Sequence, residues 1–187
     1  MNIRPAAILG FALAVASAAR AHITPPVVLT SDREAVARLL AGSSRYFVRE
    51  VRLSSADRET VRQKTGWTPD DVVYRFYLGR TAEGATVGAA IFTSEFTIHG
   101  PVRVAVALGP DGKVKGASVV EVTEESYTWV KPLLDGGLLQ RFAGRDAQGV
   151  LAQTGDVGGS MPRFYADVIA RLIGRAAALY DVSRSKK

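Results

Sequence analysis

The sequence predicts an α+β protein in which helices pack against an antiparallel sheet and a long helix closes the chain. Three observations support this prediction. Helix-period apolar patterns occur near both ends of the chain, and alternating apolar patterns fill its centre. Short turn sequences separate the central strands, and no helix lies between one strand and the next. Strands joined so closely must pair antiparallel.

The first third of the chain carries clear helix start and stop signals. Ser31 and Glu34 have the spacing of a capping box, and Gly66 is a typical residue to end a helix. In chain order, we expect an extended proline-marked segment at 22–29, a helix at 31–42, a strand at 46–53 and a polar helix at 54–64.

The centre of the chain predicts the sheet. Gly109-Pro110-Asp111-Gly112 is a strong hairpin signal, because proline presets one turn residue and glycine accepts a positive φ. The expected strands are 72–78, 86–93, 102–108 and 113–122.

After the sheet, the pattern becomes helical and loop-like again. A short amphipathic segment at 137–143 precedes a run at 144–159 that is rich in Gly, Asp and Gln. The chain then predicts a helix over 162–180 with one continuous apolar face.

Composition limits the classes of function. The 187 residues are 47% apolar and 22% charged, which is typical of a globular chain. The absence of cysteine excludes disulfides, thiolate metal sites and a cysteine nucleophile. The net charge is +6, but acids are interleaved with the basic residues, so we expect no nucleic-acid partner and favour an anionic ligand or an acidic partner protein.

Residues 1–21 have the features of a secretory signal peptide. Arg4 gives a positive start, 6–19 is an apolar stretch that is short for a membrane span, and Ala19-Arg20-Ala21 supplies a small-residue cleavage pattern. We therefore expect an extracytoplasmic protein, in the periplasm if the host is a bacterium. The alternative is an uncleaved anchor helix.

The segment with most chemical interest is the glycine-rich run before the last helix. Three glycines precede Ser160, which suits an N-cap, and Pro162 suits a first helical turn. One interpretation is a well-capped helix and nothing more. The other is a ligand site, because glycines let a backbone approach a ligand closely and the amides at a helix start attract phosphate.

Three motifs in order give a wider resemblance. They are PDGKVKGASVVEVTEES, then LLQRFAG, then the glycine-rich run with a hydroxyl residue before the terminal helix. Over residues 92–180 this resembles the FMN-binding domain family. The family's extracytoplasmic domains occur in the small flavin subunits of Rnf and sodium-translocating quinone reductase complexes and in regulators of nitrous oxide reduction. The resemblance implies that 22–187 is a single FMN-binding-like domain.

The resemblance also implies a covalent flavin. In the family, a flavin transferase joins a threonine of an S/T-G-A-T motif to FMN through a phosphoester. Here the matching run is Val157-Gly158-Gly159-Ser160, which keeps only Gly158 and has Ser160 in place of the threonine. By this resemblance Ser160 carries the FMN, and Gly158 and Gly159 line its phosphate. Covalent FMN, non-covalent FMN and no flavin all remain open.

In the family a glutamate lies near the flavin. By the resemblance, this glutamate corresponds to Glu124 or Glu125. Tyr127 and Trp129 follow closely and are candidates to shield the ring, although aromatics at this spacing are more often core residues. Alternatively, Glu124 and Glu125 lie at a solvated loop end after a strand and have no role in binding. The expected role is electron transfer with redox partner proteins, for example in a membrane electron-transport complex, and not substrate-specific catalysis.

Two other functions stay open. The altered motif is compatible with a flavin-free binding or assembly subunit of a membrane redox complex. A more remote alternative is a secreted copper protein, because cleavage after Ala21 leaves His22 as an N-terminal histidine that, with His99, has the groups of a histidine brace. Serine-hydrolase chemistry is poorly supported, since Ser160 lies in no G-x-S-x-G sequence.

Overall fold

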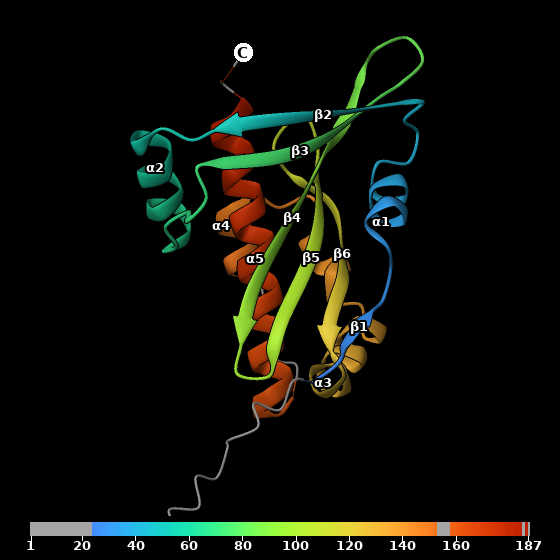
Figure 1. Ribbon diagram of the computed structural model, residues 1–187, viewed down its shortest axis with the longest axis vertical. Helices are drawn as coiled ribbons and strands as arrows, with labels where there is room; N and C mark the ends of the chain where they lie inside the picture. The colour runs from blue at the N-terminus through green and yellow to red at the C-terminus, as the bar shows by residue number, and fades with distance from the viewer. Residues whose placement is uncertain (1–23, 153–157, 185, 187) are drawn as a thin grey trace, which may run out of the picture.

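The computed structural model describes residues 24–152, 158–184 and 186 and confirms the α+β fold. Six antiparallel strands form one sheet in the order β1-β6-β5-β4-β3-β2, with helices against both faces (Figure 1). The elements are β1 (Pro26–Val28), α1 (Asp32–Leu39), β2 (Arg45–Arg52), α2 (Ser55–Thr65), β3 (Val73–Arg80), β4 (Thr86–Thr97), β5 (Gly100–Leu108), β6 (Val114–Thr123), α3 (Glu124–Asp135), the 3₁₀ helix η1 (Leu139–Phe142), α4 (Ala147–Leu151) and α5 (Ser160–Arg184).

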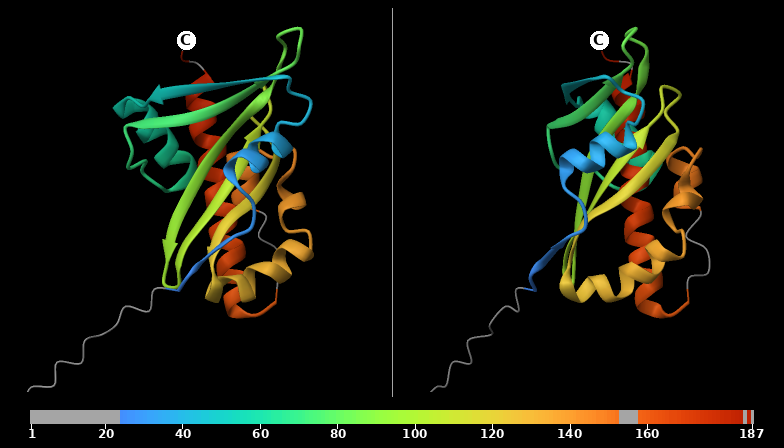
Figure 2. Two further views of the ribbon diagram at one scale, coloured as in Figure 1. Left: turned by 45° about the vertical axis from the view of Figure 1, so that its right-hand side comes forward. Right: turned by 90° about the vertical axis from the view of Figure 1, so that its right-hand side faces the viewer.

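The central strand β5 explains how two layers of helix fit on one sheet. Its valines at 102, 104 and 106 are fully buried in the main core, which includes α5. The alternate residues Ala105 and Ala107 are also fully buried, but in smaller clusters with residues of α1. Figure 2 shows α5 and α1 on opposite faces of the sheet. Small side chains on the α1 face let that short helix lie close to the strands.

Helix α5 is the largest single part of the core. It crosses the sheet at β4 and β5 and also packs against α2, α3 and α4. Most of its residues are buried, which explains why its apolar pattern extends almost all round the helix in its central turns. The observed helix begins two residues before the predicted one and continues four residues beyond it.

The local signals for helices and turns are confirmed. The Ser31 hydroxyl oxygen accepts a hydrogen bond from the Glu34 amide at 3.3 Å, and the Glu34 carboxylate accepts one from the Ser31 amide at 3.0 Å. Gly66 ends α2 with a φ of 70°. In the β5–β6 hairpin, Gly112 has a φ of 85° and the Gly109 amide donates to the Lys113 carbonyl at 2.8 Å.

Three elements were not predicted as such, among them the helix α3, where the sequence indicated only a helical or loop-like stretch. The extended entry contains β1, whose residues pair with β6 from Pro26↔Thr123 to Val28↔Glu121. The glycine-rich run contains the short helix α4, where the Asp146 carboxylate accepts from the Gly149 amide at 2.8 Å. Strand β4 is also four residues longer than expected at its end.

The sheet divides between β3 and β4. These strands pair only from Tyr77↔Ala90 to Arg80↔Thr86, with Gly79 opposite Gly88. A Cβ on Gly88 would lie 2.5 Å from the Leu108 carbonyl oxygen, so this position requires glycine. Below the pairing, the antiparallel pair of β2 and β3 turns away from β4, as Figure 1 shows. We call the opening between residues 73–76 of β3 and 91–97 of β4 the β3/β4 gap.

The predicted signal peptide at 1–21 lies outside the described residues. Within the part of the chain that the structure describes, no helix is both long and apolar enough to cross a bilayer.

Candidate functional site

Ser160 is the first residue of α5, and its side chain is exposed. The Gly159 carbonyl accepts a hydrogen bond from the Arg163 amide at 3.2 Å, which is the first bond of the helix. Gly159 therefore holds the cap position, and the expectation that Ser160 is the N-cap was wrong by one residue. Ser160 is therefore the first helical residue, because the carbonyl of Gly159 before it already accepts the first helical bond.

Gly158 and Gly159 both have left-handed backbones, with φ of 66° and 68°. A Cβ on Gly158 would meet nothing within 4 Å, and one on Gly159 would make only ordinary contact with Pro162. These glycines are therefore required by backbone conformation and not by crowding. The space beside them is open to a group that approaches from solvent. Thr154, Asp156 and Val157 lie outside the described residues.

The hydroxyl of Ser160 fits the chemistry of a phosphoester. Among the described residues, no hydrogen-bond partner holds this hydroxyl. Arg163 lies one turn along the same helix with an exposed side chain, so a cation stands near the position that an anionic group would take. The amides of Ser160 and Met161 add a partial positive charge, whereas Pro162 has no N–H and the Arg163 amide already bonds to the Gly159 carbonyl.

Glu124 and Glu125 are the first two residues of α3, and both are exposed. Thr123 caps this helix by accepting from the Ser126 amide at 3.3 Å. The Glu125 carboxylate lies 2.9 Å from Nδ1 of His99, on the β4–β5 turn. The Glu124 amide donates to the Pro25 carbonyl at 3.0 Å, so the start of α3 is also attached to the residue before β1.

A buried polar chain connects the start of α3 to α5. Thr123 donates its hydroxyl to the His99 carbonyl at 2.7 Å, and the hydroxyls of Ser126 and Tyr165 are 2.7 Å apart. Ser126 and Tyr165 are fully buried. Because every hydroxyl in this chain has a partner, the network fixes α3, the β4–β5 turn and the second turn of α5 relative to one another.

Trp129 lies between His99 and Tyr165. Its ring centroid is 5.1 Å from that of His99 and 5.9 Å from that of Tyr165, with the Trp129 and Tyr165 rings within 10° of parallel. Tyr127 lies on a different face of α3, where it lines a cavity of about 240 Å³ with Arg38 and Ser118. The two aromatics that the sequence paired as candidate ring shields therefore face different parts of the molecule.

The helix starts that carry the predicted site residues lie at the same end of the molecule (Figure 2). This end holds the exposed segment 158–160, the exposed pair Glu124 and Glu125, and the aromatic row from His99 to Tyr165. The candidate site thus combines an open hydroxyl on α5 with acids and aromatic rings on α3 and the β4–β5 turn.

Sequence reasoning missed a second region at the β3/β4 gap. A cavity of about 490 Å³ there is lined by Trp67, Asp70, Asp71, Tyr74, residues 92–96 and Arg175. Glu95 forms ion pairs of 2.8 Å with both Arg171 and Arg175. The Arg175 guanidinium also lies 5.0 Å from the centre of the Trp67 ring. Glu95, the one charged residue of β4, was the one sequence signal of this region.

Titratable groups in this cavity are shifted by burial. Burial raises the pKa of the Tyr74 hydroxyl to about 12. Burial also lowers the pKa of the Arg175 guanidinium, and the charge of Glu95 partly offsets that effect. Both shifts indicate a wall that is partly withdrawn from water.

Comparisons with known proteins identify no relative. No family model, no curated protein and no solved structure matches this chain. In the described ranges, no group of three or more His, Cys, Asp or Glu side chains has the arrangement to hold a metal ion. His22 of the copper alternative lies outside those ranges.

Proposed function

We propose that the protein is an extracytoplasmic FMN-binding electron-transfer protein whose flavin is attached through a phosphoester at Ser160. The observation that supports this most is the state of Ser160 itself. Its hydroxyl is exposed, has no hydrogen bond among the described residues, and stands on the first turn of a long helix after two left-handed glycines.

The attachment chemistry follows from these groups. A flavin transferase must supply an FMN phosphoryl group that carries a leaving group. The Ser160 oxygen forms the new P–O bond, the hydroxyl proton is lost, and the leaving group departs. The exposed Arg163 and the first-turn amides stabilise the phosphodiester charge. The open space beside Gly158 lets the transferase reach the hydroxyl.

The acids and rings at the same end of the molecule suit the rest of the cofactor. FMN, when bound, supplies one- or two-electron transfer. Glu124 and Glu125 are the proposed neighbours of the ring, and Glu125 holds His99 in a fixed orientation. Trp129 is held between His99 and Tyr165, so it offers the edge of an apolar ring to the cofactor and not a free face. Redox partner proteins, for example in a membrane electron-transport complex, belong to this proposal.

The test is an intact mass of the mature protein made in a host that also supplies a flavin transferase, paired with in-gel fluorescence after denaturation. We expect a mass increased by one FMN less one water and a fluorescent band. Ser160→Ala should abolish both. Ser160→Thr, which restores the family's residue, should keep both, and Thr128→Ala, an exposed hydroxyl on α3, should change neither.

Two results would contradict the proposal in different ways. Flavin that remains attached in Ser160→Ala would move the attachment to another hydroxyl, with Thr154 the next candidate. An unmodified mass and a colourless band in both the wild type and Ser160→Thr would reject the flavin. A flavin-free binding subunit would then be the better description.

A further inference from the structure

We propose that the β3/β4 gap binds an extended, basic segment of a partner polypeptide, which pairs with the open edge of β4. Pairing of β4 with β3 ends at Ala90, whereas pairing with β5 continues to Thr97. Along the described strands, residues 91–97 therefore pair on one side only. Such an edge presents a row of backbone donors and acceptors that can accept another strand.

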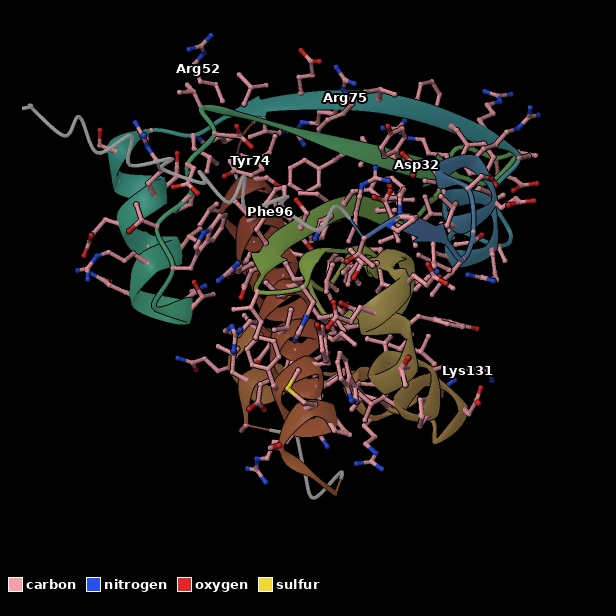
Figure 3. The ribbon with its side chains drawn as sticks, turned by 60° about the horizontal axis from the view of Figure 1, so that its bottom comes forward. Asp32, Arg52, Tyr74, Arg75, Phe96 and Lys131 are labelled. Carbon is pink, nitrogen blue, oxygen red and sulfur yellow. The ribbon has the colours of Figure 1, made fainter. Side chains whose placement is uncertain are left out.

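The gap holds two adjoining cavities. The cavity of about 490 Å³ contains lining residues from β3 and β4, and a second cavity of about 240 Å³ shares Asp71, Tyr74 and Phe92 with it. In Figure 3, Tyr74 and Phe96 are labelled at this gap. On the other side of the opening, residues 73–76 of β3 pair with β2 alone. The space is thus bordered by two unpaired strand edges, which favours an extended backbone over a compact small molecule.

Charge indicates the kind of segment. The lining of the larger cavity has three carboxylates, Asp70, Asp71 and Glu95, against one guanidinium, Arg175, which gives a formal balance of −3 + 1 = −2. The whole chain carries +6. Arg171, which contacts Glu95 from α5, brings the local balance only to −1. Arg75 and Arg103 line the smaller cavity, but each already forms an ion pair with a carboxylate outside both linings, Glu50 and Asp32 respectively. Asp70 and Asp71 are exposed and have no ion pair among the described residues, so they are free to attract lysine or arginine.

Apolar side chains lie along the same edge. Phe96 is 84% exposed on β4, although a ring of this size is usually covered. Phe92 and Phe96 lie on the sheet face away from Glu95, because strand side chains alternate. A bound strand therefore meets aromatic surface on one face and carboxylates near the other. Basic and apolar residues in alternation are the expected pattern.

This site is separate from Ser160. At 1.5 Å per residue, Arg175 lies about 22 Å along α5 from Ser160. The open edge of β4 ends at Thr97, two residues before His99, but none of the residues replaced to weaken peptide binding belongs to the proposed flavin site, so each proposal can fail alone.

The test uses the mature protein and a fluorescein-labelled heptapeptide of alternating Lys and Val, with binding followed by fluorescence anisotropy. The first comparison replaces each Lys by Glu, and we expect at least tenfold weaker binding. The second uses two isomers with N-methyl groups at odd or at even residues, which block one backbone edge each. At least one isomer should lose tenfold or more in affinity. Amide exchange should slow at 91–97 when the unmodified basic peptide binds.

Matched variants locate the site. Asp70→Asn with Asp71→Asn should weaken binding at least tenfold, whereas Glu83→Gln with Asp135→Asn, which removes two exposed acids elsewhere, should not. Phe96→Ala should weaken binding severalfold. Ile98→Ala, which is 82% exposed but lies beyond the end of β4, should not. Ser160→Ala should bind the peptide as the wild type does.

Three outcomes would overturn the proposal. One is the absence of binding by the basic peptide. Another is equal binding of both N-methylated isomers and the unmodified peptide, because that would show simple charge attraction without strand pairing. The third is protection of amides outside 91–97 with none inside. The peptide comparisons use the unmodified protein, so they remain decisive even if a variant fails to fold.

Discussion

Helix α5 has two regions that differ in almost every physical respect. Its first residue, Ser160, is exposed, follows two left-handed glycines, and presents a hydroxyl without a partner among the described residues. Its middle is buried against the sheet, and Arg171 and Arg175 form ion pairs with Glu95 on β4. The first region is built from consecutive residues. The second is assembled from residues that are far apart in the sequence.

The start of α5 is available for chemistry, whereas the middle of α5 stabilises the fold. A substitution at the start of α5 removes a group that supports little of the fold. A substitution in the middle removes a partner from a charge that is largely withdrawn from water, which is costly. The predictions below test this contrast, beginning with the largest effect.

Glu95→Gln should be the most destabilising. It leaves Arg175, whose side chain is only 15% exposed, without its carboxylate, and we expect a loss of about 3 kcal/mol in the free energy of unfolding. Urea denaturation measures it. Glu50→Gln is the matched control, because the Glu50–Arg75 pair has side chains 57% and 60% exposed and should change stability by about 0.5 kcal/mol or less. Equal losses in the two variants would contradict the assignment of stability to the middle of α5.

Tyr165→Phe should have the next largest effect. It removes the hydroxyl that lies 2.7 Å from Ser126 and leaves the Ser126 hydroxyl buried with one partner fewer. We expect a loss of about 1–2 kcal/mol in the free energy of unfolding. Tyr46→Phe, at a ring that is 47% exposed, should change stability little. If both tyrosine variants behave alike, the buried polar chain does not fix α3 on α5.

The sequence predicted those features that depend on neighbouring residues. Ser31 with Glu34, and Gly109 with Gly112, act within one helix turn or one hairpin, so their spacing alone predicts the structure. Ser160 was found for the same reason, since a hydroxyl after glycines at a helix start is a local pattern. Its position relative to the cap was missed by one residue, because the choice depends on which carbonyl accepts the first helical bond.

The features that were missed depend on residues distant in sequence. The pairing of β1 with β6 joins residues almost a hundred positions apart. The β3–β4 pairing that borders the gap places Gly79 opposite Gly88, where the Leu108 carbonyl excludes a side chain. No pattern along the chain reports such contacts. Glu95 alone could have indicated them, because a single acid in an otherwise uncharged strand requires a partner where it is buried.

Alkaline pH should lower the free energy of unfolding through Tyr74, which lines the partly buried wall of the β3/β4 gap. Burial raises the pKa of Tyr74 from 10.0 in the unfolded chain to about 12. A raised phenol pKa contributes stability below pH 10, and this contribution is lost as pH rises from 10 toward 12. Because water reaches part of the ring and screens the effect, we expect a loss of about 1 kcal/mol. Urea denaturation at pH 9 to 12 should show a smaller alkaline loss in Tyr74→Phe than in the wild type.

The smallest expected change in stability is that of Ser160→Ala. Ser160 is inside the first turn, and among the described residues its hydroxyl bonds to nothing, so the loss should be below about 0.5 kcal/mol. Ser54→Ala is the informative partner, because Ser54 is a true N-cap that accepts from the Asp57 amide at 3.2 Å, and its removal should cost about 1 kcal/mol. Denaturation curves of both variants, taken without flavin, compare their two losses in the free energy of unfolding. A Ser160→Ala loss as large as that of Ser54→Ala would mean that the serine is held as a structural cap. A negligible loss would show that the Ser160 hydroxyl does not stabilise the fold. The hydroxyl would then be available for attachment of the flavin.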